Sequence, residues 1–323
     1  MKYYLFLICF AFTPLAAYAA DSLFFLEAQT VAGYSFKEDK IIYRSAHSQY
    51  VMQKNSVGFD YIKKFSPQTT DIASAALQMR MTYNEEENKL QLQVYNAFLK
   101  AKTDLADIWA GHNRIAFGLA SYWDTHGDLL QPLPMYGFGC DRDWGVGFNK
   151  YLQNGDLQFA LTSATGMGLE AKGNWLITSR ISKGVLNYDN YNIAASFMGG
   201  RTLEAMGYKI MDYHLKNIIL AGLDGAYNHG TIEHKAEINI GRKNEKTAFA
   251  AFYRLSINFM EESALKLEGQ SVYAKLESED NFALAGGLTY RLNSYLSARS
   301  MYEWQYKPAE RKIITQLYYY FAL

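Results

Sequence analysis

Residues 231–241, T-I-E-H-K-A-E-I-N-I-G, decide the fold class of this chain. Every second residue is apolar or weakly polar, and the residues between them are hydrophilic. The first set is Ile232, His234, Ala236, Ile238 and Ile240, and the second is Thr231, Glu233, Lys235, Glu237 and Asn239. A period of two residues places the two sets on opposite faces of a β-strand. One face of this strand is therefore apolar, and the other is suited to water.

The same period recurs along most of the chain. Residues 310–323 keep it for more than ten residues, which is the length that a tilted strand needs to cross a bilayer. Clear alternation also covers 89–94, 157–162, 249–259 and 282–292. Weaker alternation covers 23–34, 48–63, 70–83, 104–114, 142–152, 174–183, 188–200, 204–213, 215–229, 263–277 and 294–306. These segments make about seventeen candidate strands, and because bacterial barrels close with an even number we expect about sixteen, with 204–213 the weakest candidate.

Proline and turn residues separate these segments. Pro67, Pro132, Pro134 and Pro308 all fall between the expected strands, where a missing backbone donor breaks no ladder. Asn-rich or Gly-containing stretches such as 84–88 and 228–230 mark further turns. Because no linker interrupts the pattern, we expect one domain over residues 20–323.

The strands are longer than those of soluble proteins. Soluble strands run about five or six residues, whereas several segments here run about ten to fifteen. Residues 1–19 combine Lys2, an apolar run and a final Ala17-Tyr18-Ala19, as in a secretory signal peptide. An open sheet edge in lipid would leave backbone donors and acceptors without hydrogen bonds, so only a closed barrel pairs the backbone of every strand. We therefore expect an all-β, closed antiparallel transmembrane barrel in the outer membrane.

Composition supports this fold class and excludes others. Aromatic residues make up 15% of the chain, with 26 Tyr, and they gather near strand ends as in membrane-interface girdles. Removal of Lys2 leaves 31 basic residues against 32 acidic ones, so nucleic-acid binding finds no support. Cys140 is the one cysteine outside the signal peptide, which excludes internal disulfides and haem attachment through C-x-x-C-H.

Two segments carry a family resemblance. Residues 110–118, A-G-H-N-R-I-A-F-G, and 141–147, D-R-D-W-G-V-G, resemble segments of outer-membrane porins of the phosphate-selective O and P group. The C-terminal strand also resembles the last strand of porins. The resemblance implies a water-filled channel for passive diffusion of small solutes or ions, with both termini in the periplasm.

The charges expected on the lumen face argue against a strongly anion-selective pore. Phosphate-selective members of the family line the channel with a ladder of basic residues. In this chain the expected lumen-facing residues carry both signs. They are Arg80, Lys89, Arg180, Glu233, Lys235, Glu237, Arg254, Arg291, Arg299 and Glu303.

One long segment without alternation, residues 115–140, is the candidate constriction. Loops of more than about 12–15 residues are uncommon unless they have a function, and this one is rich in apolar residues. We expect it to fold into the lumen, although a packed extracellular flap stays open as an alternative. A pore constriction would have an acidic side of Asp124, His126, Asp128, Asp141 and Asp143, with Arg114 and Arg142 opposite.

Catalysis finds little support in the sequence. The histidines match no metal-binding or catalytic spacing, so we expect no enzyme, metal or cofactor. An outer-membrane hydrolase using His112 with Asn113, or His234 with Ser256, is one alternative, but no third member of a triad is evident. A barrel that sheathes a periplasmic partner, such as a multihaem cytochrome, is another.

The expected partners follow from the membrane location. They are outer-membrane lipid, lipopolysaccharide, and small hydrophilic solutes or ions. The sequence leaves open whether the barrel is a monomer or a homo-trimer, and which solute it carries.

Overall fold

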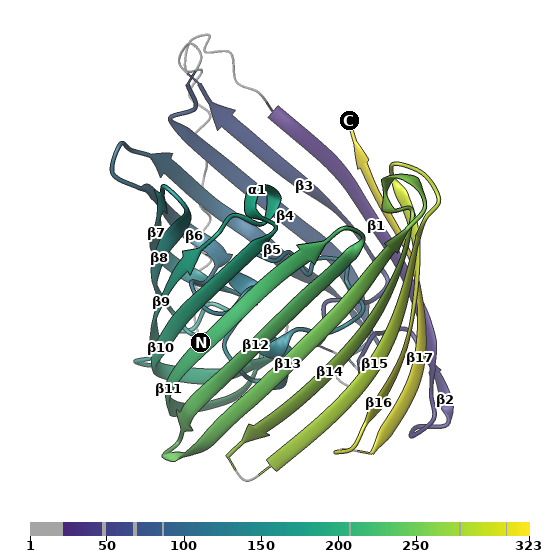
Figure 1. Cartoon of the computed structure of the whole chain (residues 1–323). Helices are drawn as coiled ribbons and strands as arrows, with labels where there is room; N and C mark the ends of the chain where they lie inside the picture. Colours follow the sequence, from purple (N-terminus) through teal and green to yellow (C-terminus); the bar gives the residue numbers. More distant parts are fainter. Residues whose placement is uncertain are drawn as a thin grey trace.

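A computed structural model describes residues 22–46, 50–66, 70–85, 87–206, 208–277, 279–307 and 309–323. Its seventeen strands form one antiparallel sheet that closes because β1 pairs with both β17 and β3 (Figure 1). β2 (Lys40–Ile42) has three residues, so sixteen long strands form the wall. The expected closed barrel of about sixteen strands is confirmed. The predicted signal peptide lies outside the described residues.

The long strands follow one another around the barrel in chain order. They are β1 (Ser22–Ser35), β3 (Ser56–Phe65), β4 (Ala73–Asn84), β5 (Lys89–Lys102), β6 (Asp107–Arg114), β7 (Arg142–Leu152), β8 (Gly155–Thr162), β9 (Trp175–Lys183), β10 (Tyr191–Met206), β11 (Lys209–His229), β12 (Ile232–Lys243), β13 (Lys246–Phe259), β14 (Leu265–Leu276), β15 (Glu279–Arg291), β16 (Leu296–Gln305) and β17 (Glu310–Ala322).

The weakest candidate, 204–213, is not a separate strand, which agrees with the expected total of about sixteen. Residues 204–206 end β10 and residues 209–213 begin β11, and Glu204 pairs with Asp212 while Ala205 pairs with Ile210. The expected strand at 48–63 is correct only from Ser56 onward. Both departures have one cause, because alternation in the sequence continues past the ends of the strands.

The barrel has two distinct rims. The first residues of β1 and the last of β17 lie at one of them, which we call the turn rim. The connections at the opposite rim, which we call the loop rim, include 36–55 and 115–141. The described helices are short: α1 (Leu186–Asp189), η1 (Leu119–Ser121), η2 (Leu133–Tyr136) and η3 (Glu261–Ser263). No described helix is long and apolar enough to cross a membrane.

The two faces of the wall differ as the alternation predicted. On β12, Ile238 and Ile240 point outward and are 51% and 58% exposed, whereas Glu237 and Asn239 point inward and are 4% and 0% exposed. Apolar side chains such as Leu92, Leu223 and Leu317 are exposed in the same way on other strands. A barrel with an apolar outer surface and a polar inner wall is the form that spans a membrane.

The C-terminal aromatic residues divide between the two faces. Tyr319 and Phe321 lie on the outer face and pack against Tyr295 at the turn rim. Tyr318 and Tyr320 point into the lumen, where the Tyr320 hydroxyl donates to Asp60 at 2.8 Å. Only the first pair can therefore belong to a girdle facing lipid.

Candidate functional site

The long connection between β6 and β7, residues 115–141, lies inside the barrel (Figure 1). We call it the long loop. Its apolar side chains, among them Phe117, Leu119 and Phe138, pack against inward apolar residues of the wall. The wall residues of this cluster are Leu176, Met198, Ile218, Leu220, Ala248, Ala250, Phe252, Val272, Ala274 and Ala283. Apolar burial therefore holds the loop against β9 to β15, on a part of the inner wall that is not polar.

The first turn of the long loop is fixed by backbone hydrogen bonds to the wall. The Ala116 amide donates to Thr178 Oγ1 at 3.2 Å, and the Gly118 amide donates to Ser196 Oγ at 3.2 Å. The Leu119 amide donates to Glu237 Oε2 at 3.1 Å. Gly118 has φ +60°, and a Cβ there would collide with the Glu237 carboxylate, so glycine is needed at this close approach.

The second half of the long loop is held by wall arginines. Arg254 pairs with Asp128 at 3.3 Å and donates to the Leu130 carbonyl at 2.9 Å. Arg299 donates to the Gly127 carbonyl at 2.8 Å. His126 lies 2.7 Å from the Glu27 carboxylate, which also pairs with Arg80 at 2.5 Å.

Aromatic residues of the long loop cover two of the wall arginines. Trp123 lies over the Arg254 guanidinium at 4.2 Å, and Tyr122 lies over Arg180 at 4.6 Å. Such cation–π contacts add to the ion pairs in a site shielded from water. Together these contacts reach β1, β4, β9, β10, β12, β13 and β16, so the loop is attached around much of the wall.

Residues 44–46 and 50–55 of the connection between β2 and β3 also enter the lumen, although alternation predicted a strand over 48–63. In this segment Val51 is fully buried, and the Met52 carbonyl accepts a hydrogen bond from Gln29 at 3.2 Å. Gln131 of the long loop donates to Ser45 of this segment at 3.3 Å. The two loops therefore contact each other inside the barrel. Alternation that continued before Ser56 concealed this insertion.

An ion pair crosses part of the loop rim. Lys209 at the start of β11 contacts Glu87 at 2.5 Å and the Tyr50 hydroxyl at 2.6 Å. Glu87 belongs to the β4–β5 connection, and β5 and β11 are separated by five strands in the sheet order. These side chains narrow the entrance above the two inserted loops.

The predicted constriction residues group differently from the expectation. Arg114 and Arg142 do not lie opposite the acidic residues, because Asp124 pairs with both, at 2.7 and 3.4 Å. Asp141 pairs with Arg142 as well. Asp143 is fully buried and accepts from the Thr165 amide at 3.1 Å, so it caps the next connection instead of facing the lumen. Ion pairs between aspartates and arginines therefore stand where the sequence predicted a separate acidic side of the constriction.

The ten predicted lumen residues all lie on the inward face. Arg80, Arg180, Arg254 and Glu303 are buried, and each has an ion-pair partner. Glu233 pairs with Lys235 at 3.0 Å, Glu237 binds the long loop, and Arg299 binds it through Gly127. Lys89 and Arg291 are exposed near the rims.

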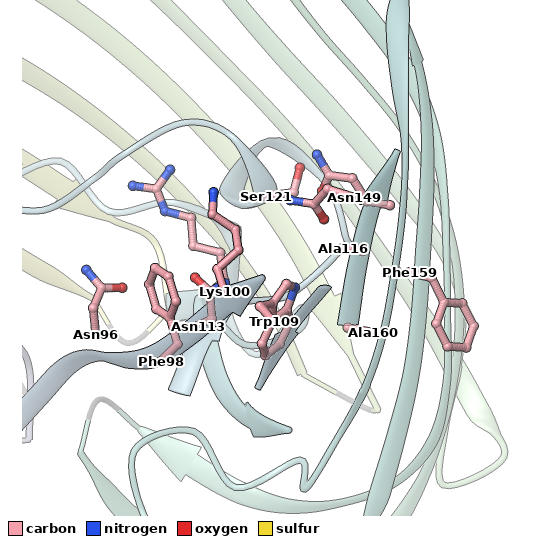
Figure 2. A pocket seen from close by; sticks show the side chains of 12 residues that line it. Asn96, Phe98, Lys100, Trp109, Asn113, Ala116, Ser121, Asn149, Phe159 and Ala160 are labelled. Carbon is pink, nitrogen blue, oxygen red and sulfur yellow. The ribbon is translucent and has the colours of Figure 1, made fainter. Parts of the chain in front are cut away.

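A polar cavity remains between the long loop and the wall of β5 to β8. Its volume is about 250 Å³, and Figure 2 shows Lys100, Trp109 and Asn149 gathered around it while Phe159 points away. Its lining residues are Asn96, Phe98, Lys100, Trp109, Asn113, Arg114, Ala116, Ser121, Asn149, Gln158, Phe159 and Ala160. Lys100 lies 3.6 Å from Asp107, and Arg114 is paired with Asp124, so both cations of the lining have carboxylate partners.

The residues considered for catalysis do not form a triad. His234 points outward and contacts the Tyr253 hydroxyl at 2.8 Å, whereas Ser256 points inward and donates to Glu268 at 3.1 Å. His112 is fully buried, with Nδ1 3.0 Å from the Tyr95 carbonyl. No metal-binding group of three His, Cys, Asp or Glu side chains occurs in the part of the chain that the structure describes.

Acid should loosen the long loop through His126. Burial, together with the charge of Arg80, lowers the pKa of His126 from its ordinary 6.5 to about 4. Glu27 and Asp124 act in the opposite direction, and Tyr95 and Tyr318 pack against the ring. A released loop would bind a proton at this residue below pH 6.5, whereas the attached loop would not. Attachment is thus strongest above pH 6.5 and weakens as the pH falls to about 4, by about 3 kcal/mol in all.

Hydrogen exchange of residues 119–131 at several pH values measures this effect. We expect faster exchange at pH 4.5 than at pH 7, and a smaller difference in His126→Gln, which has no proton to gain. An equal pH dependence in the variant would assign the effect to another group.

No protein-family model and no curated protein sequence matches this chain. Solved structures do resemble it. OmpF of Salmonella typhi, in complex with daunomycin, has a TM-score of 0.67 at 10% identity, with 94% of this chain and 97% of that chain covered. OmpT of Vibrio cholerae in its trimer form has a TM-score of 0.65 at 10% identity, with 94% and 100% covered.

An anion-selective porin of Comamonas acidovorans is similar to the same degree. Its TM-score is 0.63 at 10% identity, with 94% of this chain and all of that chain covered. These structures match nearly the whole barrel although their sequence identity to this chain is low. The shared feature is therefore the architecture. The resemblance to the phosphate-selective group stays a prediction. The chain has the fold of the 16-stranded outer-membrane porins.

Proposed function

We propose that this protein is a channel of the Gram-negative outer membrane that lets small hydrophilic solutes or ions diffuse through a narrow passage. The observation that carries the proposal is the long loop, attached to the inner wall of a barrel whose outer face is apolar. A loop in this position reduces the lumen without closing the polar cavity beside β5 to β8. The cavity is the best candidate for part of the solute path.

The pairing of charges favours weak ion selectivity. Arg114 and Arg142 share Asp124, whose side chain is 56% exposed, and Arg80, Arg180 and Arg254 are buried against carboxylates. Paired charges of opposite sign produce a smaller net field than a ring of one sign. We therefore propose that the channel selects solutes mainly by their size.

Swelling of proteoliposomes tests the proposed function. Vesicles containing the folded mature protein should swell in a pentose or hexose and swell more slowly in a trisaccharide. Heat-denatured protein serves as the control. Equal swelling with folded and denatured protein would reject a diffusion channel.

Asp124→Asn should move the ion preference toward anions. The change leaves Arg114 and Arg142 with one carboxylate fewer near the cavity, so the local net charge rises by one. The zero-current potential under a KCl gradient measures the change in selectivity. Asp104→Asn, in an exposed turn at the opposite rim, is the matched control and should leave that potential unchanged. No difference between the two variants would place the ion path away from Asp124.

The two alternative functions fit the structure less well. A sheath for a partner protein needs an open lumen, but two inserted loops occupy this one. A hydrolase needs a nucleophile within reach of a base, and neither histidine pair provides one. We propose no enzymatic activity.

A further inference from the structure

The outer face of β13 to β16 contains a groove that Arg311 of β17 also lines. Its volume is about 660 Å³. Strand register places its lining in two rows: Tyr253, Ser271, Leu284 and Trp304 in one, and Leu255, Gly269, Gly286 and Tyr302 in the other. Two glycines and a serine therefore form the floor on β14 and β15, and larger residues of β13 and β16 form the two sides.

The floor is hollow because side chains are missing there. A Cβ added to Gly269 would meet no atom within 4 Å, and one added to Gly286 would only touch the Glu268 carbonyl at 3.9 Å. Neither glycine has a positive φ. Backbone geometry and packing would thus accept larger residues at both positions. The groove therefore exists because small residues occupy these positions, and the fold itself does not require it.

A cation lies beside Trp304, at the β16 side of the groove. Arg311 pairs with Trp304 across β16 and β17, and it is exposed one residue from the loop-rim end of β17. Its guanidinium has no hydrogen bond or ion pair with any described residue, although its carbonyl accepts from the Phe36 amide. Trp304 and Tyr302 beside it are side chains that favour the boundary between lipid tails and head groups. An anionic head group can bind here while its tail follows the apolar lining.

We propose that this groove binds one acyl chain of a phosphate-bearing glycolipid of the outer leaflet, with the phosphate at Arg311. The inference rests on the proposed outer-membrane location, which places the loop rim at the outside. Arginine binds phosphate through two parallel hydrogen bonds, and the groove offers an apolar, slender path beside it. A second barrel is a poorer fit, because its wall is convex and has no free strand edge to place in a groove.

Lipid titration followed by native mass spectrometry tests the proposal. The probe is lipid A, added to the folded mature protein in detergent. Gly269→Leu/Gly286→Leu fills the groove, and Arg311→Gln removes the cation. Matched controls are Ala236→Leu and Arg201→Gln, which are exposed outward positions on other strands. Heat-dependent migration in SDS gels shows that each variant is folded.

We expect the groove-filling variant to bind lipid A at least about tenfold more weakly, and both controls to bind it as the wild type does. Arg311→Gln should weaken binding of lipid A but leave binding of uncharged diacylglycerol unchanged. Equal affinity in all variants would overturn the proposal. The proposal would also be overturned if the groove-filling variant lost its barrel oligomers but still bound lipid A. The occupant of the groove would then be a second copy of the barrel.

Channel activity separates this inference from the proposed function. Filling the groove should leave conductance unchanged, since the lumen lies on the other side of the wall. A conducting wild type that binds no lipid A rejects the groove alone. A barrel that binds lipid A at the groove but conducts nothing rejects the channel alone.

Discussion

Ile238→Arg is expected to prevent stable insertion of the barrel into lipid. Ile238 lies at the middle of β12, points outward and is 51% exposed. Its cross-strand neighbours are Leu223 on β11 and Ala251 on β13, so the surrounding surface is apolar. An arginine on the lipid face near the bilayer midplane costs about 2–4 kcal/mol. That cost is a large part of the stability of an ordinary folded domain.

Refolding into liposomes, followed by urea titration, measures the effect. Gln91→Arg is the control, because Gln91 points into the lumen and donates to Glu87 at 3.1 Å, a bond that arginine can replace. Glu237 is unsuitable as the control, although it neighbours Ile238 and also points inward, because it holds the Leu119 amide. We expect the control to refold as the wild type does. Equal loss in both variants would mean that the two faces are assigned wrongly.

Arg254→Ala is expected to release the second half of the long loop and raise conductance several-fold. Arg254 is 1% exposed and binds Asp128, the Leu130 carbonyl and Gln270. Its removal leaves Asp128, whose side chain is 28% exposed, without its closest cation and takes away the partner of Trp123. Breaking a buried ion pair costs about 3–5 kcal/mol, and the partial exposure of Asp128 places this pair at the lower end of that range.

Single-channel recordings of this variant give the conductance, and hydrogen exchange of residues 122–131 reports whether the loop has left the wall. Arg291→Ala is the matched control, because Arg291 is also on the inward face but is exposed and makes no side-chain contact with the long loop. We expect the control to conduct like the wild type. Faster loop exchange with unchanged conductance would show that the long loop does not limit the passage.

The fold could be predicted from the sequence because strand faces are a local property. The outward and inward sets on β12 and β17 follow directly from alternation at 232–240 and 313–323. Lipid makes the pattern stricter than in soluble sheets, because a charge on the outer face is costly. The apolar composition of the long loop likewise indicated burial, and the loop packs against Leu220, Ala250 and Phe252.

The arrangement of the site could be predicted only in part, because it depends on pairs far apart in the chain. Nothing near Asp128 indicates that its partner is Arg254, and nothing near His126 indicates Glu27. Aspartates spaced along one loop predicted an acidic surface, but partners from the wall neutralise them. The insertion of residues 44–46 and 50–55 was also missed, because alternation continued before Ser56 and the contacts of the segment are with Gln29 of β1 and Gln131 of the long loop.

Single-channel conductance of the refolded protein in a planar bilayer, under a salt gradient, tests the central claim most directly. The claim is that a narrow aqueous path crosses this barrel beside the long loop. It predicts stable, stepwise conductance that is small for a barrel of sixteen long strands, with a zero-current potential close to that of a weakly selective pore. Protein that is folded and inserted but passes no current, in the wild type and in Arg254→Ala alike, would contradict it.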